Sequence, residues 1–219
     1  LVFDSKASYS RYARTELGDA VDAIIGYYSV RSNRVIMYDL AGGGSASRIR
    51  DFLSQPDSAR NVATIIHEAT HQLALNRGLH QRYADIPLWV SEGIAVYFET
   101  PDLQSRTGWR TIGGENPARQ ARLTEYLRKR PVDSLKSLLA ADDRFRDPQT
   151  ADDAYAEAWA LNTFLFTRHR EKYLAYLRGL AARKPLFLDT AEERLAAFEA
   201  AFGPLAEVEA AFLQAQRSP

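Results

Sequence analysis

Residues 65–71 read Ile-Ile-His-Glu-Ala-Thr-His, a His-Glu-x-x-His pattern among apolar residues at helical spacing. The surrounding sequence predicts a helix over about residues 56–78, between a Pro-Asp-Ser start and a glycine end. Side chains four residues apart share one face of a helix, so His67 and His71 can both reach one tetrahedral metal ion. Glu68 lies about 100° around the helix from His67, where it can accept a proton from a metal-activated water molecule. This stretch therefore predicts a hydrolytic metal site on a helix.

A third ligand is expected because a hydrolytic zinc site takes three protein ligands and leaves one position for water. Residues 87–98 read Pro-Leu-Trp-Val-Ser-Glu-Gly-Ile-Ala-Val-Tyr-Phe, a short helix in which Glu92 is the one carboxylate. Among apolar neighbours a carboxylate carries a desolvation cost unless it is paired or coordinated, although an exposed helix edge is the alternative for Glu92. We therefore expect His67, His71 and Glu92 to hold one Zn²⁺, which lowers the pKa of bound water from about 15.7 to about 7.

The two stretches together resemble the gluzincins, zinc peptidases with a His-Glu-x-x-His helix and a glutamate ligand on the following helix. The Trp-x-x-Glu-Gly-x-Ala form of residues 89–95 looks like that of aminopeptidase-type members. Residues 67–73, 76–79 and 87–98 resemble more closely an uncharacterised bacterial family of exported zincin-like metallopeptidases, known mainly from genome sequences. The specific match covers roughly residues 27–101 and implies a zinc hydrolase that is secreted or otherwise extracytoplasmic.

The resemblance also implies two further parts of the site. Zincins bind the substrate backbone along an antiparallel edge strand that precedes the metal helix in the sequence. Residues 35–39 are at the right place in the sequence to form that strand. An edge strand without a role in substrate binding is an equally good interpretation of them. Many gluzincins use a downstream tyrosine or histidine to stabilise the oxyanion. Tyr155 is the candidate, because it shares a helical face with Trp159 and Asn162 and follows Glu92 at a comparable distance. A tyrosine that only packs is the competing interpretation.

One position departs from the gluzincin pattern. Several gluzincins carry an acidic residue four positions after the glutamate ligand to orient a histidine, and here Val96 occupies that position. Glu99, seven residues after Glu92 and on nearly the same face, and Asp85 are the candidates for this orienting role. A solvated surface acid is the alternative for each of them.

Three other polar residues could have functional roles. His80 and His169 have no ligand spacing relative to the motif, which favours a surface or packing role. Arg82 precedes the glutamate helix and could bind a substrate carboxylate or an oxyanion, but a surface role is the stronger expectation among 28 basic residues.

The rest of the chain supplies a small sheet and many helices. A short strand is expected at residues 1–3, helix-like spacing follows at residues 8–23, and a β-hairpin is expected over residues 26–39. The glycines of residues 42–45 match neither a phosphate loop nor a dinucleotide fingerprint and predict a linker. Downstream helices are expected at residues 119–130, 132–140, 151–182, 191–202 and 205–216.

Composition excludes several classes of function. Lys plus Arg and Asp plus Glu are both 28, giving a net charge of zero, so nucleic acid is not an expected partner. Absence of cysteine excludes a thiol nucleophile and a cysteine-ligated zinc site. No stretch approaches the roughly 18 uninterrupted apolar residues of a membrane span.

These observations predict one zincin-like catalytic domain of class α+β over residues 1–219. Residues 1–78 would form the sheet and the metal helix. Residues 79–219 would form the glutamate helix and a mainly helical lobe, which would be the other wall of the substrate cleft. We expect a zinc metallopeptidase acting on a peptide or protein substrate, with Glu68 and Tyr155 as its catalytic residues. Endopeptidase action is favoured, because the acidic site with which aminopeptidases bind a free amino terminus needs a Gly-x-Met-Glu-Asn-like strand, and residues 34–39 lack that motif. The alternatives are hydrolysis of a non-protein amide, such as a cell-wall component, and metal binding without turnover.

Overall fold

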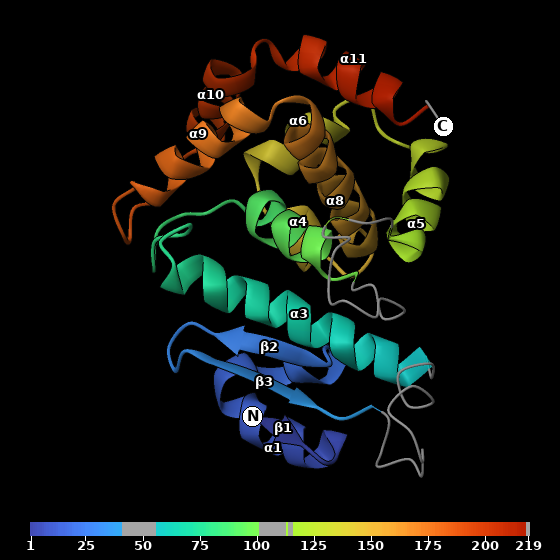
Figure 1. The fold of residues 1–219 in the computed structure, drawn as a ribbon, viewed down its shortest axis with the longest axis vertical. Coiled ribbons are helices and arrows are strands. Elements are labelled where there is room, and N and C mark those ends of the chain that lie inside the picture. Colours follow the sequence, from blue (N-terminus) through green and yellow to red (C-terminus); the bar gives the residue numbers. More distant parts are fainter. Residues whose placement is uncertain (41–55, 101–112, 114–115, 218–219) are drawn as a thin grey trace, which may run out of the picture. The chain divides into compact units, whose positions relative to one another are not determined.

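The computed structural model describes residues 1–40, 56–100, 113 and 116–217, with the backbone alone for residues 23 and 56–59. These residues form a small three-stranded sheet near the N-terminus followed by helices, which confirms the α+β class (Figure 1). The glycine-rich residues 42–45 lie outside the described residues. Within the described part of the chain, no helix is long and apolar enough to cross a membrane.

Contacts divide the chain into two compact units. One comprises Leu1–Leu73 and Phe98–Gly114, and the other Ala74–Tyr97 and Glu115–Pro219. The single catalytic domain expected from the sequence stays a prediction.

The sheet contains β1 (Val2–Phe3), β2 (Gly26–Ser29) and β3 (Arg34–Tyr38) in the order β1-β3-β2. The antiparallel β2–β3 pair, with Gly26 opposite Met37 and Ser29 opposite Arg34, confirms the predicted hairpin. Helix α1 (Lys6–Leu17) and the 3₁₀ helix η1 (Gly18–Ala23) follow β1. Burial of apolar side chains from these helices and from the hairpin forms the core of this unit, which contains Tyr9, Ala13, Val21, Tyr27 and Ile36.

Strand β3 is not an edge strand, so both expectations for residues 35–39 are wrong. The first residues of the chain pair in parallel with it: Met37 N donates to Leu1 O at 3.0 Å and Asp39 N donates to Phe3 O at 2.9 Å. Since β2 pairs with the other side, β3 is the central strand and its backbone groups are used within the sheet.

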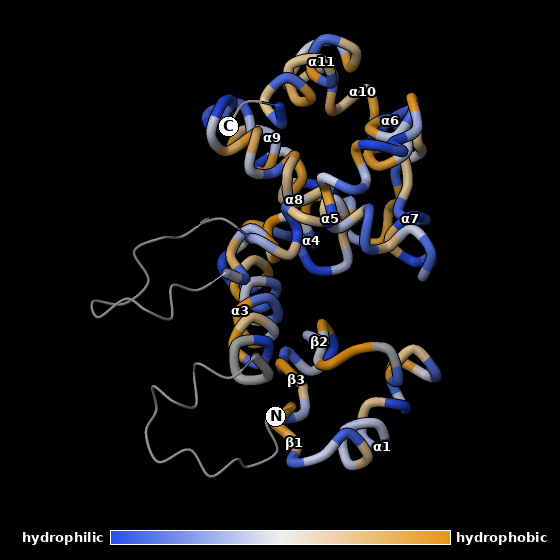
Figure 2. The backbone as a smooth tube through the Cα atoms, turned by 90° about the vertical axis from the view of Figure 1, so that its right-hand side faces the viewer, coloured by the Kyte–Doolittle hydropathy of each residue, from blue (hydrophilic) through white to orange (hydrophobic). Residues whose placement is uncertain are grey.

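Helix α3 (Pro56–Asn76) is anchored to the sheet through side chains near both of its ends. The Asn61 side chain accepts from Leu40 N at 3.1 Å and donates to Asp39 Oδ1 at 2.7 Å. Farther along, Gln72 Nε2 donates to Asn33 O in the hairpin turn at 2.8 Å. Hydrophilic and hydrophobic residues alternate along α3 as in an amphipathic helix (Figure 2). These bonds hold the predicted metal helix at a defined position relative to the sheet.

The second unit is built from helices. Helix α4 (Leu88–Phe98) is the predicted glutamate helix. The helices that follow are α5 (Pro117–Leu127), α6 (Ser134–Ala140), α7 (Asp143–Arg146), α8 (Ala151–Arg168), α9 (Arg170–Ala181), α10 (Ala191–Phe202) and α11 (Leu205–Ala215).

The helices differ from the sequence prediction in the short helix α7, which was not expected, and in a break within residues 151–182. The predicted helix over residues 151–182 is two helices, because His169 leaves the helical region with φ −133° and ψ 32°. Its ring contacts Phe164 of α8, with ring centroids 5.2 Å apart, and Phe202 of α10, at 6.4 Å. Contacts between helices therefore override the local helix propensity at this position.

Candidate metal centre

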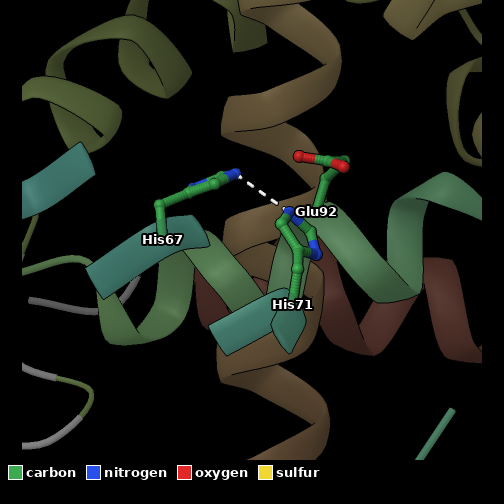
Figure 3. Close-up of side chains that lie close together, drawn as sticks. All are labelled: His67, His71 and Glu92. Atoms are coloured by element: carbon green, nitrogen blue, oxygen red, sulfur yellow. Dashed lines mark hydrogen bonds between the residues drawn. The ribbon is translucent and has the colours of Figure 1, made fainter. Parts of the chain in front are cut away.

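Helices α3 and α4 bring the three predicted ligands together. One ligand atom each from His67, His71 and Glu92 can be chosen so that all lie within 4.8 Å of one another (Figure 3). The Nε2 atoms of the two histidines are 3.2 Å apart. Two nitrogens each about 2.0–2.1 Å from one tetrahedral ion lie about 3.3 Å apart, so the imidazole pair has the spacing that a single ion requires.

The donor set also fits a catalytic zinc ion. Two imidazoles and one carboxylate are the ligands of a well-known class of hydrolytic zinc sites, whose fourth position holds water. Glu68 follows His67 directly on α3 and lies outside this group of three, as expected of a base that is not a ligand. The chain has no cysteine, so its ligands for zinc must be nitrogen and oxygen atoms.

Glu99 orients His67. Its Oε2 atom lies 3.0 Å from His67 Nδ1, and the two side chains are only 15% and 14% exposed. A carboxylate at Nδ1 favours the tautomer with the proton on that nitrogen, which leaves the lone pair of Nε2 for a metal. Of the two interpretations of Glu99, contact with a histidine of the motif is therefore correct; Glu99 follows directly after the last residue of α4, seven positions beyond Glu92.

Asp85 has neither of the roles expected for it. It is 9% exposed, and its Oδ1 accepts from Arg194 Nη2 at 2.7 Å. The same guanidinium donates from Nη1 to Asp142 Oδ1 at 2.9 Å, and this carboxylate oxygen also accepts from Leu88 N at 3.0 Å. Asp85 is thus part of a buried ion network that ends at the first residue of α4.

The glycine after the glutamate ligand is explained by packing. A Cβ atom on Gly93 would lie 2.8 Å from Asn162 Cγ and 2.9 Å from Ala158 O on α8, too close for any other residue. Asn162 Nδ2 donates to Trp89 O at 2.9 Å and to Ala158 O at 2.8 Å, and its Oδ1 accepts from the Tyr173 hydroxyl. This buried amide therefore ties α8 to the turn of α4 that carries Glu92.

Tyr9 of α1 lies within the electrostatic reach of Glu68. Burial raises the pKa of Tyr9 well above its ordinary value, and the charges of Tyr27 and Glu68 add to the shift. The Tyr9 side chain is fully buried, and among the described residues its hydroxyl has no hydrogen-bond partner. The charge of the general-base candidate is therefore felt at this buried tyrosine.

Tyr155 lies on α8 in a packing environment. Its half-buried ring has its centroid 5.3 Å from that of Phe145, and Cζ of Arg119 lies 5.2 Å from the same ring. These contacts do not distinguish a catalytic from a packing tyrosine, so its oxyanion role stays a prediction.

The remaining polar candidates have structural contacts. His80 is buried, and His169 packs against aromatic rings, so both match the packing interpretation. Arg82 Nη2 donates to Asn76 Oδ1 at 2.8 Å in an exposed bond, in keeping with a surface role.

Comparison with known families gives a match over the site. The family model described as "Protein of unknown function (DUF1570)" matches residues 61–187, more than half of the chain. The match includes the three residues of the candidate metal centre. No curated protein and no solved structure matches the chain.

Proposed function

Because the chain belongs to the DUF1570 family of unknown function, and because its structure joins His67, His71 and Glu92, we propose that it is a zinc-dependent peptidase of the gluzincin type. The observation that carries the proposal is the convergence of two imidazole nitrogens and one carboxylate. The order of these residues on consecutive long helices, with Glu68 beside the first ligand, supports hydrolysis rather than a purely structural metal site.

The roles of the residues follow from their positions. His67, His71 and Glu92 hold the ion, and Glu99 keeps the imidazole of His67 in the ligating tautomer. Zinc, when bound, supplies a Lewis acid that activates water and polarises the carbonyl under attack. Glu68 takes the proton of the attacking water and later delivers it to the leaving amine.

The substrate class is part of the proposal. We assign a peptide or protein substrate and internal cleavage, because residues 34–39 lack the Gly-x-Met-Glu-Asn-like motif with which aminopeptidases bind a free amino terminus. Tyr155 remains the proposed oxyanion donor. Location outside the cytoplasm rests on the resemblance to exported metallopeptidases, and a net charge of zero gives no support to a nucleic-acid partner.

The proposal is tested with zinc-loaded protein and a diverse peptide mixture, with new termini read by mass spectrometry. Glu68→Gln at the same zinc occupancy is the matched control, because it keeps the size of the side chain and removes the base. Cleavage by the wild type alone supports the proposal. No cleavage by either protein, or equal cleavage by both, contradicts it; release of amides from cell-wall fragments without peptide cleavage would identify a different substrate class.

A further inference from the structure

Four large apolar side chains gather at one exposed place in the second unit, which we name the apolar tip. Leu186, Phe187 and Leu188, between α9 and α10, are 83%, 68% and 83% exposed, and Tyr83, between α3 and α4, is 60% exposed. The two segments are joined because Leu186 N donates to Tyr83 O at 2.7 Å. Val132 is the other exposed large apolar residue among the described residues of this unit. A cluster of this kind on a protein surface marks an interaction site.

The backbone of the apolar tip is held in an unfavourable conformation. Tyr83 has φ 62° and Leu186 has φ 68°, in the left-handed region that bulky side chains avoid. Neither side chain is buried, so core packing does not compensate for the strain. Strained residues of this type concentrate at functional sites, where the surrounding structure holds them in place.

The size and shape of the apolar tip do not suit a second protein. A standard protein interface uses about 20–30 residues from each partner, and four side chains are too few for a stable dimer. Residues 186–188 are consecutive and each is more than two-thirds exposed, so a flat partner would cover only one side of them. A medium that surrounds the tip would bury all three, and the interface of a lipid bilayer is such a medium.

The polar groups beside the apolar tip are of the kinds found at the interface of a lipid bilayer. Lys184 Nζ lies 6.0 Å from the centroid of the Phe187 ring, which places a cationic group beside the apolar tip. Tyr83 adds an aromatic ring that ends in a hydroxyl group, and tyrosine is enriched at membrane interfaces. Arg183 is ion-paired with Asp189, so Lys184 is the main cationic contribution of this segment.

We propose that the apolar tip inserts into the interface of a phospholipid bilayer and docks the protein reversibly on a membrane surface. Leu186, Phe187 and Leu188 enter the acyl boundary, and Tyr83 and Lys184 lie at the level of the headgroups. Apolar burial dominates the binding, so neutral and anionic bilayers are both bound. This docking is independent of the metal centre.

Flotation of the full chain with phosphatidylcholine vesicles, and with vesicles that also contain phosphatidylserine, tests the proposal. We expect binding to both, and the triple substitution Leu186→Ser, Phe187→Ser and Leu188→Ser should weaken partitioning more than about a hundredfold. Val132→Ser is the control for an exposed apolar residue elsewhere and should bind like the wild type. Melting temperatures should match, because these side chains are exposed.

A second measurement reports on the apolar tip directly. The chain has no cysteine, so Leu188→Cys or Val132→Cys gives a single site for an environment-sensitive fluorophore. Addition of vesicles should shift the emission of the label at residue 188 to shorter wavelength and leave the label at residue 132 unchanged. Absence of vesicle binding by the wild type, or equal binding by the triple variant, overturns the proposal. Self-association lost in the triple variant, without vesicle binding, would assign the tip to a second copy and also overturn it.

Discussion

Removal of the Glu99 carboxylate should weaken zinc binding without removing a ligand. In the structure Glu99 Oε2 is 3.0 Å from His67 Nδ1, in surroundings where both side chains are at most 15% exposed. Loss of such an orienting carboxylate costs about 10–100-fold in metal affinity, which is about 1.4–2.7 kcal/mol. Glu99→Ala should reach this range, and Glu99→Gln should lose less, because its amide oxygen still accepts a hydrogen bond but carries no charge.

The assay for this prediction is competition for zinc with a chelator of known affinity, followed at fixed pH. Glu125→Gln is the control, since that side chain is 67% exposed and pairs with Arg122 one helical turn away. Apo-protein melting temperatures separate a loss of affinity from a loss of fold. Unchanged zinc affinity in Glu99→Ala, with Glu125→Gln also unchanged, would refute the orienting role.

Three further predictions concern the helices around the site. Gly93→Ala forces a methyl group against Asn162 and should lower the free energy of unfolding by about 1–3 kcal/mol in urea titrations; an unchanged midpoint would contradict the packing argument. Arg194→Ala leaves the buried carboxylate of Asp85 without its guanidinium partner and should cost about 3–5 kcal/mol by the same method, whereas a loss below about 1 kcal/mol would show that the network is dispensable. Tyr155→Phe should reduce kcat about 100–1000-fold, or about 3–4 kcal/mol, with little change in melting temperature; a near wild-type kcat would make Tyr155 a packing residue.

Local features of the site could be predicted from the sequence because they depend on helical period alone. Spacing placed His67 and His71 on one face, and the same argument placed Glu99 two turns from Glu92. The hairpin was predictable for a similar reason, since two β-rich runs flank a polar turn at residues 31–34.

Features that depend on distant parts of the chain could not be predicted. Asp85 pairs with Arg194, 109 residues away, and no local pattern distinguishes it from a solvated acid. Strand β3 became central because the first three residues of the chain pair with it, a long-range choice that strand propensity does not encode. The break at His169 is set by rings on α8 and α10, so a continuous helical pattern was the best local expectation.

The zinc content of the chain tests the central claim most directly. After dialysis against zinc and removal of free ion, the wild type and Glu68→Gln should each retain about one zinc ion per chain, because the base is not a ligand. His67→Ala and Glu92→Ala should retain much less. A wild-type content far below one ion, or loss of zinc from Glu68→Gln, would contradict the assignment of His67, His71 and Glu92 as ligands and Glu68 as base.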